Sequence, residues 1–226
     1  MSSRDDILAR VKNNQPSFRE LPALPAGART SSANTAPNDD PQTTFITSLE
    51  SIGGAAYLVS GFDRIATILR ERYPHARRVV TTCASLSDRM ETISASIDPH
   101  TLENVDLAIL PAHFAVAENG ACWITESQMG IRALPFIAQH LALVVPLSAI
   151  VPDMHAAYER IAALDQAARE PGAAPDQPIP EDGFATFIAG PSKTADIEQS
   201  LVLGAHGPAS LTVFLLDEQL TDAGFY

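Results

Sequence analysis

The sequence predicts an α/β fold in which a mostly parallel sheet carries helices on both faces. Short apolar runs of strand length alternate with stretches of helical periodicity through most of the chain, as in parallel strands joined by crossover helices. The 226 residues suffice for one sizeable α/β domain with a well-buried core, or for two small ones.

Two segments at the start of the chain are expected to lie outside this domain. Residues 1–14 predict a short docking helix that packs on the domain or on a neighbouring subunit. This helix would have an acidic first turn and an apolar stripe, formed by Asp5, Asp6, Ile7, Leu8 and Val11. Residues 15–41 hold five prolines and no periodicity, which predicts an extended linker. The domain then occupies residues 42–226.

Within the domain, the elements follow from hydrophobic periodicity and from Gly and Pro breaks. Helices are predicted around residues 45–52, 65–69, 131–139 and 154–168. Strands are predicted at residues 55–60, 78–82, 106–110, 121–125, 141–146, 184–189 and 211–216. The strands between residues 106 and 143 come closer together than the rest, which indicates a hairpin or a small mixed region. A Pro-rich loop is expected at residues 170–183.

The stretch around which the domain is predicted to be organised covers residues 184–216. Its apolar start at residues 184–189 has the length and composition of a strand buried on both faces. A Gly-Pro pair ends this strand, and Ser192 and Thr194 are credible N-caps for a following helix. Residues 211–216 then predict a second buried strand. In such units, ligands gather at the carboxyl ends of strands, facing helix N-termini.

Charge and cysteine content exclude several classes of function. The formal net charge of -12 argues against binding to nucleic acid or to an anionic membrane surface. No apolar run reaches the roughly 18 residues of a membrane span, and the N-terminal residues lack the apolar core of a secretory signal. Cys83 and Cys122 cannot supply the four thiolates of an iron–sulfur cluster, and we expect plain buried thiols. A cytoplasmic location fits best.

Glu118, Asn119 and Gly120 lie between two apolar segments and form the first candidate site. A carboxylate beside a turn at a strand end could act as a nucleophile or as a general base. Asn-Gly is also the strongest short signal for a β-hairpin, in which Glu118 would only be solvated. Both interpretations stay open, with Glu118 as the catalytic candidate and its two neighbours as candidates for binding a ligand.

The second candidate site is the polar turn formed by Gly190, Ser192, Lys193, Thr194 and Asp196. Free backbone N–H groups, two hydroxyls and an ammonium could hold a phosphate or a carboxylate. The spacing is not that of a P-loop, because the second glycine before Lys-Thr is missing. Alternatively, the acidic residues that follow Thr194 cap the helix dipole themselves.

His206 is the third candidate, as a general acid or base that titrates near neutral pH. Its neighbours are small, so a loop histidine with a single backbone hydrogen bond is the alternative. The six histidines never pair at metal-ligand spacing and no Cys-x-x-Cys occurs, so no metal site is expected. No cofactor is expected either, because no cofactor-binding motif is present.

Residues 190–198, followed by residues 201–204 and 206–208, resemble the C-terminal signature of the LUD-domain family. Residues 114–120 resemble that family's Ala-Glu-Thr-Gly segment, with Asn119 where Thr is common. The Asp-Ile-Leu-Ala-Arg start and the Pro-rich linker also resemble the family's N-terminus. The resemblance covers nearly the whole chain, and the segment from Cys83 to Pro99 matches least.

The resemblance implies a Rossmann-like three-layer α/β/α domain, similar to ribose-phosphate isomerases and CoA transferases. It implies a bacterial role in oxidising L-lactate to pyruvate with two partner proteins that carry iron–sulfur clusters. The chain would then be a non-redox subunit that binds a small anion at residues 190–194.

Two other functions stay open. Glu118-Asn119-Gly120 is similar to the Ser-Glu-Asn-Gly motif of CoA transferases, whose Glu forms an acyl-CoA adduct, although Ala117 replaces the Ser here. The chain would then catalyse acyl transfer by itself. A scaffold whose loops only bind partners is the third possibility. Shared fold does not carry function.

Overall fold

The computed structural model describes residues 3–16, 40–93, 97–168, 183–195 and 201–217. The chain divides into two compact units, Met1–Ala33 and Asn34–Tyr226. The first unit contains helix α1 (Ser3–Asn13), which confirms the predicted N-terminal helix. Asp6 and Arg10 form an ion pair of 3.0 Å along one side of α1. The three side chains of its apolar stripe are exposed, at 57% for Ile7, 52% for Leu8 and 58% for Val11.

The second unit alternates strands and helices along most of its length. Its longer helices are α2 (Pro41–Ser51), α3 (Phe62–Arg72) and α6 (Met154–Ala168). Shorter helical turns are η1 (Ala84–Leu86), η2 (Pro99–Leu102), α4 (Glu126–Met129), α5 (Leu134–Ile137) and η3 (Leu147–Ala149). The strands are β1 (Ala55–Val59), β2 (Val79–Thr81), β3 (Glu91–Thr92), β4 (Leu107–Pro111), β5 (Phe114–Val116), β6 (Ala121–Thr125), β7 (His140–Pro146), β8 (Ile150–Val151), β9 (Ala185–Ala189), β10 (Lys193–Ala195), β11 (Leu201–Leu203) and β12 (Ser210–Leu216).

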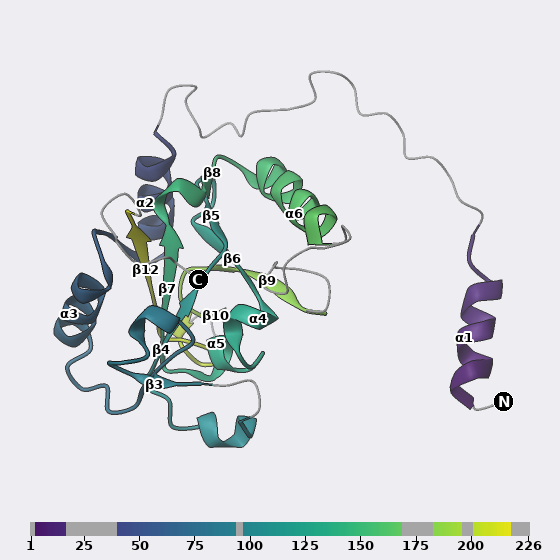
Figure 1. Ribbon diagram of the computed structural model, residues 1–226, viewed down its shortest axis with the longest axis horizontal. Coiled ribbons are helices and arrows are strands. Elements are labelled where there is room, and N and C mark those ends of the chain that lie inside the picture. Colours follow the sequence, from purple (N-terminus) through teal and green to yellow (C-terminus); the bar gives the residue numbers. More distant parts are fainter. Residues whose placement is uncertain (1–2, 17–39, 94–96, 169–182, 196–200, 218–226) are drawn as a thin grey trace. The chain divides into compact units, whose positions relative to one another are not determined.

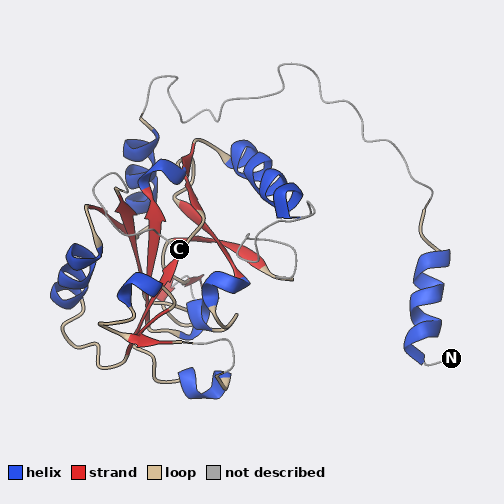
Figure 2. Cartoon of the chain, in the orientation of Figure 1, coloured by secondary structure: helices blue, strands red, loops and turns tan. Residues whose placement is uncertain are grey.

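Six strands form the central sheet, in the order β1-β12-β7-β4-β2-β3, and every neighbouring pair is parallel. Strands β4, β7 and β12 are buried along almost their whole length, because helices or a second sheet cover both faces. The predicted α/β fold with a mostly parallel sheet is therefore confirmed (Figures 1 and 2).

Helix α3 covers one face of the central sheet (Figure 1). Its residues Ile65, Ile68 and Leu69 recur at helical spacing and are all buried. They pack with Val59 of β1 and Phe214 of β12 in one hydrophobic cluster. Fully burying a side chain of this size contributes about 1.5–3 kcal/mol, so this apolar stripe fixes α3 on the sheet.

A second, mixed sheet lies on the opposite face of the central sheet, with strand order β8-β5-β6-β9. Strands β5 and β6 form an antiparallel hairpin, with Phe114 opposite Trp123 and Val116 opposite Ala121. The predicted hairpin between residues 106 and 143 is therefore confirmed. Helices α2, α4 and α5 and the hairpin share the larger hydrophobic core with the central sheet. Figure 1 shows β6 and β9 on the side of the sheet away from α3.

Two predictions for the C-terminal part of the chain were wrong. Residues 184–189 were expected to form a strand buried on both faces, but β9 pairs antiparallel with β6 at an edge of the small sheet and is partly exposed. A helix was expected to start at Ser192 or Thr194 and to continue through Glu198, of which residues 196–198 lie outside the described residues. Instead β10 forms an antiparallel pair with β11, with Thr194 opposite Val202. Branched residues in both segments favour this pairing.

Candidate functional site

Two of the predicted motifs, the turn at Gly120 and the turn at Gly190, each pack against the C-terminal part of helix α2. Gly120 has φ +67° and Gly190 has φ +70°, a left-handed conformation that favours glycine. A Cβ on Gly120 would lie 2.7 Å from the Cα of Leu49, and one on Gly190 would lie 3.0 Å from the carbonyl oxygen of Ile52. The motif glycines thus let two turns approach the backbone of the same helix, one turn apart.

The turn at residues 190–194 is closed by backbone hydrogen bonds. Ser192 N–H donates to the Pro208 carbonyl at 2.8 Å, and Gly204 N–H donates to the Ser192 carbonyl at 3.0 Å. A Cβ on Gly207 would lie 3.1 Å from the Cβ of Ser192, so the glycine allows the two turns to pack. The two halves of the C-terminal signature therefore form one structural unit. The Ser192 amide is already used and is not free to hold an anion.

Lys193 reaches toward the end of helix α2. Its Nζ lies 3.7 Å from the position of a Cβ built on Gly53, which follows the last helical residues. A helix C-terminus carries partial negative charge, so an ammonium in this place stabilises the helix. The Lys193 side chain is exposed. The ammonium is therefore also accessible to a small anion, in which case a hydroxyl of Ser192 or Thr194 would be within the same turn.

These loops lie at the amino edge of the central sheet, not at the carboxyl ends of its strands where ligands were expected. Gly53 precedes β1, and the signature turn around Gly207 precedes β12. Ala209 N–H donates to the Gln139 carbonyl at 2.8 Å, directly before β7. The turn at residues 190–194 follows β9 of the small sheet and reaches this edge through Pro208.

Glu118 lies in the hairpin turn between β5 and β6, which confirms the turn that Asn-Gly predicted. Its Oε2 accepts a hydrogen bond of 3.0 Å from the Met154 N–H at the start of α6. Asn119 Oδ1 accepts a second bond, of 3.0 Å, from the Ala121 N–H. The strand order β8-β5-β6-β9 places the Glu118 carboxylate on the β8 side of the hairpin. The turn at residues 190–194 follows β9, on the other side.

The remaining predicted residues have plainer surroundings. His206 is exposed in the turn between β11 and β12. Asp196 lies outside the described residues. Cys83 and Cys122 are both buried, as predicted. Burial raises the pKa of the Cys83 thiol to about 12, and it also raises the pKa of the Cys122 thiol. Within the described ranges, no three His, Cys, Asp or Glu side chains gather as metal ligands, and no helix has the length and apolarity that crossing a bilayer requires.

Sequence reasoning missed a hydrogen-bonded cluster at the amino edge of the central sheet. The Tyr73 hydroxyl lies 3.0 Å from Ser210 Oγ and 2.8 Å from Thr212 Oγ1. Ser210 Oγ also lies 2.9 Å from His140 Nδ1. No local spacing links these residues, because Tyr73 and Ser210 are 137 positions apart in the sequence. The parallel pairing of β7 with β12, which sets Ser210 opposite His140, brings them together.

A second cluster that the sequence did not indicate lies near the carboxyl ends of β4 and β6. His113 Nε2 lies 3.1 Å from Thr125 Oγ1, and both residues are buried. Gln128 caps the short helix α4 by accepting a bond of 3.2 Å from the Thr125 N–H. Its Nε2 has no hydrogen-bond partner among the described residues. The capping box explains why the side-chain amide of Gln128 is buried, and its Nε2 atom is left unsatisfied.

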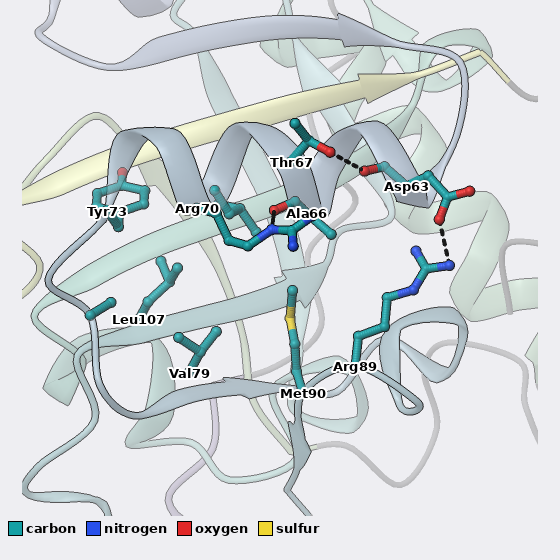
Figure 3. A pocket seen from close by; sticks show the side chains of 11 residues that line it. Asp63, Ala66, Thr67, Arg70, Tyr73, Val79, Arg89, Met90 and Leu107 are labelled. Atoms are coloured by element: carbon teal, nitrogen blue, oxygen red, sulfur yellow. Dashed lines mark hydrogen bonds and ion pairs between the residues drawn. The ribbon is translucent and has the colours of Figure 1, made fainter.

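A cavity with a volume of about 510 Å³ lies under α3 (Figure 3). Its floor is formed by Val79 and Leu107 of the central sheet, with Met90 rising toward the helix. Arg89 and Asp63 form an ion pair at one end of it. None of the residues predicted as a site lines this cavity.

Comparison with known proteins identifies the family of this chain. The family model described as LUD domain matches residues 97–216, more than half of the chain. "Lactate utilization protein C" of Bacillus pumilus is 28% identical over 145 residues, which cover 64% of this chain and 54% of that protein. The protein of the same name from an Exiguobacterium species is 27% identical over 166 residues, covering 69% and 68%. The chain thus spans about half to two thirds of the relatives' length.

A solved structure shares the fold. A crystal structure of a DUF162 family protein from Deinococcus radiodurans matches 78% of this chain and 96% of its own, with a TM-score of 0.55 and 20% identity. At this identity the likeness concerns the fold, namely the parallel sheet flanked by helices. The family model, which includes β4 to β12, contains both signature turns and the hairpin. The chain belongs to the LUD domain family.

Proposed function

We propose that this chain is a non-redox subunit of a cytoplasmic lactate utilization system, in which iron–sulfur partner proteins oxidise L-lactate to pyruvate. Family membership and the names of the curated relatives support this role. The chain contains only two cysteines, both buried, so it has no set of four thiolates for a cluster of its own. Electron transfer is therefore assigned to the partners.

The observation that carries the subunit role is an exposed apolar strand within the family signature. Leu201, Val202 and Leu203 of β11 are 62%, 44% and 51% exposed. Exposed apolar groups in a row are typical of a surface that binds another protein. Phe136 and Ile137 of α5 are each 42% exposed, and the Phe136 carbonyl lies 3.7 Å from a Cβ built on Gly207 in the adjoining turn. We propose that a partner protein docks on β11, and that α1 provides a second docking element.

Within this role, we propose that residues 190–194 bind a small anion. Lys193 supplies the charge, and the hydroxyls of Ser192 and Thr194 supply hydrogen bonds, because the Ser192 amide is already engaged. The remaining candidates around this turn are Gly190, which allows the close approach to α2, and Asp196. His206 in the adjoining turn is the candidate general acid or base for the bound anion.

Binding of the partners to β11 can be tested directly. Leu201→Glu and Val202→Glu should abolish co-purification of the proposed iron–sulfur partner proteins when they are co-expressed with this chain. Leu58→Glu is the matched control, because Leu58 is a similarly exposed leucine, at 54%, on β1. Equal capture by all variants would show that β11 is not the docking surface.

Binding of an anion can be tested separately by thermal unfolding with lactate, pyruvate, phosphate, nucleotides and CoA. A ligand at a hundredfold its dissociation constant adds about 2.7 kcal/mol to the free energy of unfolding. At least one of these anions should stabilise the parent chain and lose that effect in Lys193→Ala. No stabilisation by any of the compounds would leave the chain as a scaffold that acts only through its partners.

A further inference from the structure

A second cavity, of about 420 Å³, opens at the amino edge of the central sheet. Its walls come from the end of α3 and the segment after it, from Asp106 before β4, and from the first residues of β7 and β12. Its described lining contains none of residues 190–194. We call it the amino-edge pocket, and its lining includes Arg72, Tyr73, Asp106, His140 and Ser210. The volume lies within the range of small-molecule sites.

Arg72 is the fixed cation of the amino-edge pocket. Its Nη1 donates to the Tyr57 hydroxyl at 3.3 Å, and its guanidinium carbon lies 5.8 Å from the centre of the Tyr73 ring. A guanidinium has five N–H donors, so these contacts orient the group and leave donors for a ligand. An oriented guanidinium binds a carboxylate through two parallel hydrogen bonds.

His140 is held by two neighbours that line the same pocket. Its Nδ1 lies 2.9 Å from Ser210 Oγ, and its ring packs on Tyr73 with 4.7 Å between ring centres. The Tyr73 hydroxyl contacts Ser210 and the buried Thr212, which fixes Tyr73 in turn. Because Nδ1 is committed to Ser210, Nε2 is the ring nitrogen through which His140 would bind a ligand.

Asp106 gives the pocket a carboxylate as well, and this restricts the class of ligand. Its Oδ2 accepts hydrogen bonds of 2.7 and 2.9 Å from the backbone N–H groups of Arg77 and Arg78. These bonds hold the carboxylate in place and engage Oδ2, which leaves Oδ1 to accept a bond from a ligand. Asp106 can still accept a hydrogen bond from a hydroxyl. A pocket with an oriented guanidinium and a hydrogen-bond acceptor fits a molecule that carries both a carboxylate and a hydroxyl.

We propose that the amino-edge pocket is a binding site for a small hydroxy carboxylate, a choice of ligand class that rests on the lactate utilization role proposed above. The carboxylate binds Arg72, and the hydroxyl lies between His140 and Asp106. An oxo acid of the same skeleton has no hydroxyl proton to donate to Asp106, and therefore binds more weakly. The site is distinct from the Lys193 turn, although the hydrogen bond between Ala209 and Gln139 joins the two regions.

Isothermal titration of the full chain tests this assignment, with L-lactate and pyruvate as one pair of probes and L-malate and oxaloacetate as another. Inorganic phosphate is the probe for a site that binds any anion. The variants are Arg72→Gln and His140→Asn, which keeps a polar group near Ser210. Arg64→Gln is the matched control, because Arg64 is an exposed α3 arginine that does not line the pocket. Thermal unfolding verifies that each variant is folded.

At least one hydroxy acid should bind. Its dissociation constant should be at least threefold lower than the dissociation constants of its oxo acid and of phosphate. Its dissociation constant should rise tenfold or more in Arg72→Gln and in His140→Asn, and stay within twofold in Arg64→Gln and Lys193→Ala. The assignment is overturned if no hydroxy acid binds, if phosphate binds equally well, or if affinity survives in Arg72→Gln. Loss of binding in Lys193→Ala alone would also overturn it, and would instead support the Lys193 turn.

Discussion

The Glu118 carboxylate accepts a hydrogen bond of 3.0 Å from the Met154 N–H, and so joins the β5–β6 turn to the first turn of α6. Asp153 Oδ1 accepts the Ala156 N–H at 2.8 Å in the same helical turn. Two carboxylates therefore bind the N-terminal amides of α6, where the helix dipole favours negative charge. This arrangement gives Glu118 a structural role that its sequence motif did not indicate.

Replacing Glu118 should therefore lower stability. We expect Glu118→Ala to reduce the free energy of unfolding by about 1–2 kcal/mol, as for other lost caps, and Glu118→Gln by about half of that because the amide still accepts a bond. Urea denaturation measures both, with the exposed Glu103→Gln as a control that changes little. Unchanged stability in Glu118→Ala would contradict the capping role.

The same residue decides the acyl-transfer alternative. A Glu118 nucleophile would form an adduct with acyl-CoA, which mass spectrometry of the intact protein detects. We expect no adduct, because the hydrogen bond from the Met154 amide to Oε2 gives the carboxylate a structural role at the start of α6. An adduct that appears in the parent chain and disappears in Glu118→Gln would restore the transferase hypothesis.

Substitution of Gly120 should be costly. Gly120→Ala would combine an unfavourable positive φ with a Cβ only 2.7 Å from the backbone of Leu49. We expect a loss of at least about 2 kcal/mol, since overpacking alone costs about 1–3 kcal/mol. Gly183→Ala is the control, because its Cβ would meet only Arg132 Nη2 at 3.6 Å. Equal stability of the two variants would show that the hairpin and α2 separate readily.

The two thiols should be unreactive in the native protein. With a pKa of about 12, roughly one Cys83 thiol in ten thousand is ionised at pH 8, and the thiolate is the reactive form. Cys122 is fully buried. Iodoacetamide at pH 8 should therefore modify neither residue within hours, and should modify both in guanidinium chloride. Rapid native alkylation would indicate that the core opens more easily than its packing suggests.

His140 should make stability depend on pH. Burial lowers its pKa below 6.5 and Arg72 lowers it further, while Asp106 opposes this shift. Between the lowered value and 6.5, the unfolded chain binds more protons than the folded one, so stability rises with pH. The contribution is fully present above pH 6.5 and is lost as the pH falls through 6.5 toward the folded pKa.

Urea denaturation between pH 7.5 and 5 measures this effect. The parent chain should lose more free energy of unfolding over this interval than His140→Asn does. Asp106 does not interfere, because hydrogen bonds from Arg78 and Arg77 lower its pKa below 3.8. Parallel curves for the parent and the variant would mean that His140 titrates alike in the folded and unfolded states.

Much of the central sheet could be predicted from the sequence, because local patterns carried the signal. The α3 stripe at Ile65, Ile68 and Leu69 has helical spacing, and the Asn119-Gly120 pair marks a hairpin turn. The continuous apolar run of β7 indicates a strand buried on both faces. In each case the residues that make the element lie close together in the sequence.

Other features depend on contacts between distant segments and had no local signal. The apolar run of β9 could not reveal which of two sheets it joins. The pairing of β10 with β11 overrode the helix that Ser192 and Thr194 suggested. The pocket formed by Tyr73, His140 and Ser210 depends on strand register alone. The N-terminal helix α1 was predictable, and its docking remains a prediction.

Growth on L-lactate as the sole carbon source tests the central claim most directly. The host is a bacterium that lacks its own lactate utilization protein C but retains the iron–sulfur partners, and it receives this chain with or without Leu201→Glu. The account predicts growth with the parent chain and with Leu58→Glu, and none with Leu201→Glu. Failure of the folded parent chain to restore growth beside its own partner proteins would contradict a role in lactate utilization.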